Sequence, residues 1–367
     1  MSSDVRRAPA AYVLRGTAAA QQGEGEAVIG DDALSVGPVT VSFLDADALR
    51  AADYRIEMDL WPSGRLEPSQ LGRRFDTFRA ALARARSQAR VAGLLAHGIE
   101  MPEVFGGALL DGRTASAAEF QIYATHLTVV PEGADPFQVP HGALTGVAVS
   151  DDPPSVVLET TGGRTVAGQL GRKRDAFRDA VSKRRDAQAR LLEALTGVAE
   201  FADGLALPGS RVRGFDALLS RVTAAERAEG AATLMGAAKG GEPRLGFAQL
   251  LDPDAEAVQP ATPLPENWAA FLLVPVGKVA AFEVLAGPSA ATYVFEGDPD
   301  TVGRDLQALH LRRGPLALTD KEAELTPANP YRLALRRLEP LARLRKATRA
   351  RVIHIEGWAE ALKRALA

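Results

Sequence analysis

The sequence predicts an α+β fold in which short antiparallel strands lead into one amphipathic helix, and in which this series occurs twice. One observation is an internal duplication: the stretch from Gly64 to Gly98 recurs from Gly163 to Gly197 at a constant offset of 99 positions (163 minus 64), without a gap. Another is that the hydrophobic period changes within each copy from two residues to three or four, as it does where strands give way to a helix. A repeat of about 100 residues has the length of a small domain. We therefore expect two copies of one module.

The duplicated stretch carries a signature at the junction between the last strand and the helix. Its members are Gly64-Arg65, Gln70-Leu71-Gly72-Arg73, Asp76, Phe78, Arg79, Ala81 and Arg86, matched by Gly163-Arg164, Gln169-Leu170-Gly171-Arg172, Asp175, Phe177, Arg178, Ala180 and Arg185. A functional interpretation is a twin anion site, in which glycine admits a ligand to the backbone and arginine binds it. A structural interpretation is favoured, because glycine serves the turn, an acidic residue suits the first helical turn and phenylalanine fills a core. The signature residues to which we assign this structural role are Gly72, Arg73, Phe78, Gly171, Arg172 and Phe177.

In the first copy, turn residues and alternation place the strands. Residues 26–29 and 33–36 flank Gly30-Asp31-Asp32, which is typical of a hairpin because Gly and Asp tolerate the backbone angles of the turn. Apolar residues alternate with polar or small ones over residues 39–43 and 56–60, which predicts half-buried strands.

The helix of the first copy is expected from Phe75 to Gly93 or Gly98, after a turn at residues 61–64. Its apolar residues recur at three- and four-residue steps, at Phe75, Phe78, Leu82, Ala85, Ala89 and Ala92. The arginines are predicted to lie largely off this face, at Arg73, Arg74, Arg79, Arg84, Arg86 and Arg90.

The second copy repeats the order with stronger strands. They are expected at residues 120–124, 127–130, 137–139, 144–149, 156–158 and 165–167, with turns at 131–133, 140–142 and 161–163. A helix from Phe177 to Leu195 closes the series. Such a helix supplies the apolar face that a small open barrel needs at one end.

The strand series of residues 118–169, followed by Leu170-Gly171-Arg172 and an arginine-rich helix, resembles the pleckstrin-homology-like (PH-like) superfold, including its bacterial and GRAM-type members. The resemblance covers residues 24–98 and 115–197. It implies tandem seven-stranded, partly open barrels, each capped by a C-terminal helix. Such barrels bind peptides, protein surfaces or lipid headgroups and are rarely catalytic. Fold alone does not fix function.

The domains that follow from these patterns are ordered along the chain. We expect PH-like modules at residues 1–100 and 101–200, a helical connector and proline-rich linker at 201–265, and a C-terminal α+β module with basic helices at 266–367. The connector is expected to hold helices at 215–225 and 231–238, and its linker is the Pro-rich stretch 252–265. The last module is expected to hold strands near 271–274, 279–284 and 292–295 and helices over 331–347 and 357–367, as in a third, diverged copy.

Composition excludes several classes of protein. The chain has 367 residues, a formal charge of -3 and no cysteine, so disulfides, thiolate metal sites and a cysteine nucleophile are excluded. No apolar stretch of signal-peptide length follows the N-terminus, and no run of about 18 apolar residues occurs. A cytoplasmic location is expected.

The helix of the second copy is basic, and the C-terminal stretch 331–367 is more so, with ten basic and three acidic residues. Candidate contacts to a partner or an anion are Arg336, Arg337, Arg343, Arg345, Lys346, Arg349 and Arg351. Three interpretations stay open: a solvated face or a contact with the acidic rest of the same chain, a partner protein or anionic membrane surface, and nucleic acid. The scarcity of aromatic residues here disfavours nucleic acid.

Lipid binding by a PH-like barrel calls for a basic cluster in the loop that joins the first two strands. We expect that loop at Gly30-Asp31-Asp32 in the first copy and at Ala124-Thr125-His126 in the second. Neither loop has the positive charge needed to hold a phosphoinositide, so we favour protein recognition over lipid binding.

Motifs for catalysis, metals or cofactors are not found. The five histidines have no metal-ligand spacing: His97, His126, His141, His310 and His354. Phosphate-binding loops, dinucleotide fingerprints and nucleophile elbows are missing. We expect no cofactor and no enzyme, but a scaffold or adaptor that binds a protein partner or itself; the alternative is a peripheral binder of an anionic membrane or nucleic acid through the basic C-terminal helices. An enzyme would place its cleft near His310 or His354.

Overall fold

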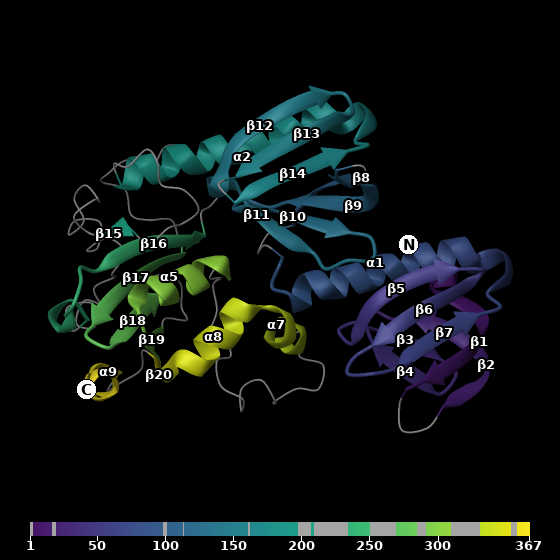
Figure 1. The fold of residues 1–367 in the computed structure, drawn as a ribbon, viewed down its shortest axis with the longest axis horizontal. Coiled ribbons are helices and arrows are strands. Elements are labelled where there is room, and N and C mark those ends of the chain that lie inside the picture. The colour runs from purple at the N-terminus through teal and green to yellow at the C-terminus, as the bar shows by residue number, and fades with distance from the viewer. Residues whose placement is uncertain are drawn as a thin grey trace.

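The structure, a computed structural model, describes most of the N-terminal half of the chain and separate segments of the rest. The described residues are 3–16, 20–97, 101–112, 114–160, 162–196, 207–208, 234–249, 269–284, 291–309, 331–353 and 358–367. They form three antiparallel sheets with helices, so the predicted α+β class is confirmed (Figure 1). No helix in these described segments is long and apolar enough to span a membrane.

The first sheet is curled, and its two halves meet at its first strand. Its strands are β1 (Arg7–Arg15), β2 (Gln21–Ile29), β3 (Ala33–Val36), β4 (Val39–Ser42), β5 (Ala46–Ala52), β6 (Arg55–Leu60) and β7 (Arg65–Ser69). They lie in the order β4-β3-β2-β1-β7-β6-β5. Strand β1 pairs with β2 along its length and with β7 through the five residues from Ala11 to Arg15. One long strand therefore joins two meanders into a single sheet.

Helix α1 (Phe75–Gly93) follows a 3-10 turn at Gly72–Arg74 and packs on the first sheet. Its apolar face supplies four core residues, Phe78, Ala81, Leu82 and Ala85. They pack with strand residues that include Ile56 and Met58, both fully buried. Burial of a phenylalanine side chain contributes about 2–3 kcal/mol, so Phe78 alone anchors the helix firmly.

The second sheet repeats the first. Its strands are β8 (Glu103–Asp111), β9 (Thr114–Ile122), β10 (His126–Pro131), β11 (Phe137–Pro140), β12 (Leu144–Asp151), β13 (Pro154–Thr160) and β14 (Gly163–Gly168), followed by helix α2 (Arg174–Thr196). The order β11-β10-β9-β8-β14-β13-β12 matches that of the first sheet strand for strand. The Phe177 ring of α2 lies 5.3 Å from that of Phe105 and 5.4 Å from that of Phe120, so the signature phenylalanine joins helix to sheet.

In the first two sheets the hairpins and helices expected from the sequence are present, but the first strand of each sheet was missed, and so was strand β5. Strand β1 contains Pro9 among small residues, and β8 contains Gly106-Gly107, so neither shows clear alternation. The loop assignment was therefore wrong: Gly30-Asp31-Asp32 joins β2 to β3, and Ala124-Thr125 joins β9 to β10. The acidic charge of the first of these loops consequently says nothing about a lipid site between the first two strands.

The third sheet has a different strand order. Its strands are β15 (Leu207–Pro208), β16 (Arg244–Gln249), β17 (Ala269–Val276), β18 (Val279–Val284), β19 (Ala291–Glu296) and β20 (Thr348–Ile353), and its helices are α5 (Pro299–Ala308), α7 (Tyr331–Arg337), α8 (Glu339–Ala347) and α9 (Trp358–Leu366). The described strands lie in chain order, so they do not repeat the order shared by the other two sheets. The third copy stays a prediction. The helix expected at 215–225 and the linker at 252–265 lie outside the described residues; residues 234–237 form one helical turn.

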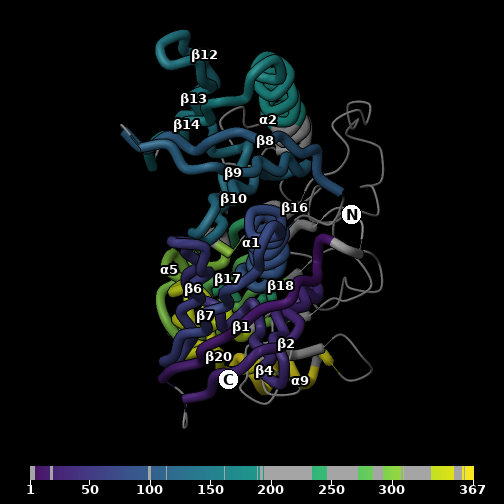
Figure 2. The backbone as a smooth tube through the Cα atoms, turned by 90° about the vertical axis from the view of Figure 1, so that its right-hand side faces the viewer, coloured from purple at the N-terminus to yellow at the C-terminus, as the bar shows by residue number. Residues whose placement is uncertain are grey.

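Helix α1 lies between the first and second sheets (Figures 1 and 2), and helix α7 approaches one of its ends (Figure 1). Helix α7 contacts α1 directly. The short segment after α1 is held by the second sheet, because Gln138 donates to the Leu95 carbonyl at 3.2 Å and Thr128 donates to that of Ala96. The end of α1 is thus a junction shared by all three parts of the chain.

Candidate functional site

The duplicated signature forms the turn from the last strand into the helix. Gly72 and Gly171 have φ of +57° and +56°, and the glutamines two positions earlier are also left-handed, at +59° and +54°. Only glycine adopts this backbone without strain. The leucine between them is buried in both copies, and the arginine that follows, Arg73 or Arg172, is exposed. The backbone of this turn therefore calls for glycine in both copies.

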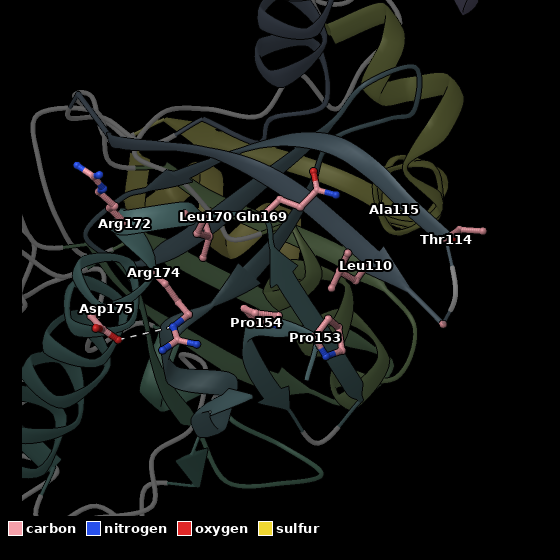
Figure 3. A pocket seen from close by; sticks show the side chains of 12 residues that line it. Leu110, Thr114, Ala115, Pro153, Pro154, Gln169, Leu170, Arg172, Arg174 and Asp175 are labelled. Carbon is pink, nitrogen blue, oxygen red and sulfur yellow. Dashed lines mark ion pairs between the residues drawn. The ribbon is translucent and has the colours of Figure 1, made fainter. Parts of the chain in front are cut away.

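In the second module, the same turn borders an open pocket of about 750 Å³ (Figure 3). The pocket lies where the β8–β9 turn, the β12–β13 turn and the start of α2 meet. Its lining consists of Leu110, Gly112, Thr114, Ala115, Pro153, Pro154, Gln169, Leu170, Gly171, Arg172, Arg174 and Asp175. Gly168 makes room for one wall, because a Cβ there would lie 2.6 Å from Leu110 Cδ1. Leucine and proline side chains give the pocket an apolar interior.

Charged side chains stand at the rim of this pocket. Arg174 Nη1 lies 2.9 Å from Asp151 Oδ1, and Arg174 Nε lies 3.8 Å from Asp175 Oδ1 (Figure 3). Both carboxylates are solvent-exposed, so these pairs are weak. Arg172 is exposed and makes no ion pair with any other described residue. Arg172 therefore brings an uncommitted guanidinium to the rim, and its side chain extends away from the apolar interior (Figure 3).

The corresponding corner of the first module carries an aromatic pair instead. Tyr54 and Phe75 occupy the positions that Pro153 and Arg174 hold in the second copy, at the offset of 99 residues. Their ring centroids are 5.4 Å apart at an interplanar angle of 61°, an edge-to-face contact. The two modules thus share the turn but differ in what stands beside it.

The predicted basic contacts begin with two arginines of α7 that meet acidic residues of the first two modules. Arg336 Nη1 donates to Asp45 Oδ1 at 3.2 Å, and Arg336 also donates to the Leu44 carbonyl. Arg337 Nη2 lies 2.9 Å from Asp47 Oδ1, and Arg337 Nε lies 3.9 Å from Asp135 Oδ2. Burial lowers the pKa of Arg336, and the neighbouring Asp45 and Asp47 act against this. For these two residues the contact lies within the same chain.

The other basic candidates are more dispersed. Arg343 forms a two-pronged pair with Asp305, with distances of 3.0 Å from Nε and 2.6 Å from Nη2. Arg345 is half-buried, whereas Lys346 and Arg349 are exposed. The side chain of Arg351 lies outside what the structure describes.

Two buried arginines of α1 were misplaced by the sequence reasoning, which set them off the apolar face. Arg86 is 1% exposed and Arg90 is fully buried. Both donate to the Ala46 carbonyl, at 2.9 and 3.0 Å, and Arg90 Nε donates to Asp135 at 2.7 Å. Burial, then repulsion by Arg90, lowers the pKa of Arg86 to about 10, which still leaves it charged at neutral pH. The sequence held no specific signal for this role: Arg86 recurs as Arg185, but the exposed Arg73 recurs in the same way as Arg172.

The histidines form no reactive group among the described residues. His141 is fully buried and its Nε2 donates to the Tyr123 carbonyl at 2.9 Å; burial lowers its pKa to about 4, so it is neutral. His126 is buried beside Gln138, at 3.1 Å between their nitrogens. His310 and His354 lie outside the described residues. In the described part of the chain, no three His, Asp or Glu side chains are placed to hold a metal ion.

Comparisons with known proteins identify no family for the chain. No family model matches it, and no curated protein matches it. Among solved structures, the C-terminal domain of an unknown protein from Leishmania infantum is similar to part of it, with 14% identity and a TM-score of 0.23, over 26% of this chain and 91% of that one. A likeness of this size carries no argument about fold or function.

Proposed function

We propose that the chain is a non-enzymatic protein-interaction scaffold built from two PH-like modules, and that the pocket of the second module receives a peptide of a partner. The PH-like assignment is supported by the strand order common to the first two sheets, by the first strand that joins two meanders, and by the helix that follows each sheet. Seven strands and a closing helix are what that resemblance implies.

One observation carries the choice of site. The two modules share the Gln-Leu-Gly-Arg turn, yet beside it the second has an open apolar pocket, whereas the first has an edge-to-face contact between Phe75 and Tyr54, a residue that is 76% exposed. A turn needed only for folding does not call for an apolar hollow of this size beside an exposed arginine. The chemistry of the pocket suits a bulky apolar side chain with a carboxylate beside it, the latter paired with Arg172.

An anchored side chain does not by itself give useful affinity. Burial of one leucine or phenylalanine contributes about 2–3 kcal/mol, whereas a micromolar complex needs about 8 kcal/mol. Strand β12 offers further contacts, because it is an edge strand that pairs with β13 alone among the described strands and ends at Asp151 beside the pocket. An extended peptide that adds to this edge gains backbone hydrogen bonds.

The alternative, a binder of anionic membranes or nucleic acid through the C-terminal helices, has less support. Arg336, Arg337 and Arg343 are paired with carboxylates of the same chain. Charge that is already neutralised contributes little to counterion release or to attraction by a lipid surface. Deletion of residues 331–367 with a loss of salt-dependent binding to phosphatidylserine vesicles would favour this alternative.

The proposal is tested by closing the pocket with the residues of the other module. Peptides selected from a random phage-displayed library on the full chain serve as probes, and calorimetry measures their affinity. The variant P153Y/R174F, which copies the aromatic pair, should weaken binding at least tenfold. The matched variant Y54N/F75R in the first module should leave it unchanged, because asparagine tolerates the left-handed backbone of Tyr54 at φ +57°. Equal binding to P153Y/R174F and the parent chain, with both folded by circular dichroism, would reject the site, and so would a selection that recovers no peptide.

A further inference from the structure

We propose that the first module carries a receptor groove for a basic amphipathic helix, that helix α7 fills it within the chain, and that α7 of a second copy is its ligand in trans. The groove is formed by Leu44, Asp45 and Asp47 before and at the start of β5 and by Gly93 and Leu94 at the end of α1. It is distinct from the pocket of the second module and does not depend on the function proposed for that pocket.

The apolar seat of the groove takes one leucine of α7. Leu333 is fully buried in a cluster with Leu44 and Leu94, against which Leu338 packs. Gly93 supplies the hollow, because a Cβ there would lie 3.1 Å from Leu333 Cδ2 and 2.6 Å from Leu44 Cδ2. A leucine that leaves this seat would return an apolar side chain to water.

Charge complementarity surrounds this seat. Three arginines of α7 face carboxylates: Arg336 and Arg332 lie 3.2 and 3.8 Å from Asp45 Oδ1, and Arg337 lies 2.9 Å from Asp47 Oδ1. The Arg336 guanidinium also sits 4.4 Å above the ring of Trp61, a cation–π contact. The recognised pattern is a leucine followed, three and four residues later, by two arginines, which places all three on one side of a helix.

The groove is built by residues other than those of α7. Arg86 donates to the carbonyls of Ala46 and Asp47, at 2.9 and 2.8 Å, and Arg90 donates to Ala46 and to Asp135. These bonds hold the acidic start of β5 against α1 from below. A receptor that is organised before its ligand arrives loses less conformational entropy on binding.

Helix α7 also packs against the third sheet, and this contact determines which part of the chain two copies would exchange. Ala334 and Leu341 belong to the core of that sheet, together with Phe282 and Phe295. The helix therefore moves with its module, and the exchange unit is the C-terminal module of one copy against the first module of another. A second copy fits the groove because it carries the same leucine and arginines.

Complementary charge variants of the full chain test this inference. In R336E/R337E the helix cannot dock, and in D45K/D47K the groove cannot receive it. Each variant alone should stay monomeric, whereas native mass spectrometry of the mixture should show a one-to-one heterodimer. The reason is that the intact groove of R336E/R337E can bind the intact helix α7 of D45K/D47K. The control K346E/R349E, which alters exposed residues near the same helices, should not replace R336E/R337E in the mixture.

Several outcomes are decisive. A mixture that stays monomeric while both variants keep the circular dichroism of the parent chain overturns the inference. So does a mixture in which K346E/R349E works equally well. If D45K/D47K does not fold, D45N/D47N takes its place with the same expectation. If R336E/R337E binds a labelled peptide of residues 329–347 but forms no heterodimer, the groove takes a free helix but not the α7 of a second folded copy, and the second-copy assignment is wrong.

Discussion

Arg90 connects the first module, the second module and helix α1 through one buried guanidinium, and its removal is the most informative single change. It is fully buried, its Nη1 donates to the Ala46 carbonyl at 3.0 Å, and its Nε donates to Asp135 at 2.7 Å. Loss of one member of a buried pair costs about 3–5 kcal/mol. The Asp135 side chain keeps about a third of its surface in water, and Arg86 still donates to the Ala46 carbonyl. We therefore take the low end of that range of energies. We expect R90A to lower the free energy of unfolding by about 3 kcal/mol.

Urea unfolding followed by circular dichroism measures this loss, with R84A as the control on the same helix because Arg84 is exposed. An exposed substitution of this kind changes stability by less than about 0.5 kcal/mol. The double variant R90A/D135A should show a coupling of about 1–3 kcal/mol between the two residues. If R90A costs no more than R84A, or if Arg90 and Asp135 do not couple, the reasoning about the buried junction is refuted.

Three further predictions concern the second module. G171A, at φ +56°, should destabilise by about 1 kcal/mol in urea unfolding, whereas G106A, with open space around it and no positive φ, should not. F177A should cost about 3–5 kcal/mol in the same assay, because it removes a fully buried ring from two aromatic contacts; a loss below about 1 kcal/mol would contradict the packing. His141 stays neutral in the folded chain, where its pKa is about 4, against 6.5 in the unfolded chain. Its contribution to the free energy of unfolding is therefore present above pH 6.5 and is lost as the pH falls toward 4. The stability difference between the parent chain and H141Q should therefore shrink by about 3 kcal/mol across that window, and a constant difference would count against a buried neutral imidazole.

Strong periodicity made much of the fold predictable. The alternation of Ile56 and Met58 and the helical spacing of Phe78 and Leu82 each describe a surface that must be covered on one side, and those elements are where they were expected. The first strand of each module escaped, because alanine, proline and glycine give little contrast between its two faces. Because this strand was not predicted, the loop that was taken to join the first two strands of each module in fact joins the second and third.

The candidate sites were less accessible from sequence, for two physical reasons. The sequence does not distinguish a buried arginine from a solvated one, so Arg86 and Arg90 were assigned to the solvent-exposed face of α1. Their partners, Asp135 and the Ala46 carbonyl, lie 40 or more positions away along the chain and are found only in the structure. The pocket combines three turns that are far apart along the chain. The available signal was the difference between aligned copies, in which Tyr54 becomes Pro153.

Hydrogen exchange of the full chain with and without a selected peptide tests the central claim most directly. The account predicts that added protection falls on residues 110–115, 150–154 and 169–175, around the pocket of the second module and the end of β12. The corresponding turn of the first module, at residues 53–55 and 70–76, should keep its exchange rates. Protection of the first-module turn, or protection spread equally over both, would contradict the claim that the duplicated scaffold carries a binding site in the second copy.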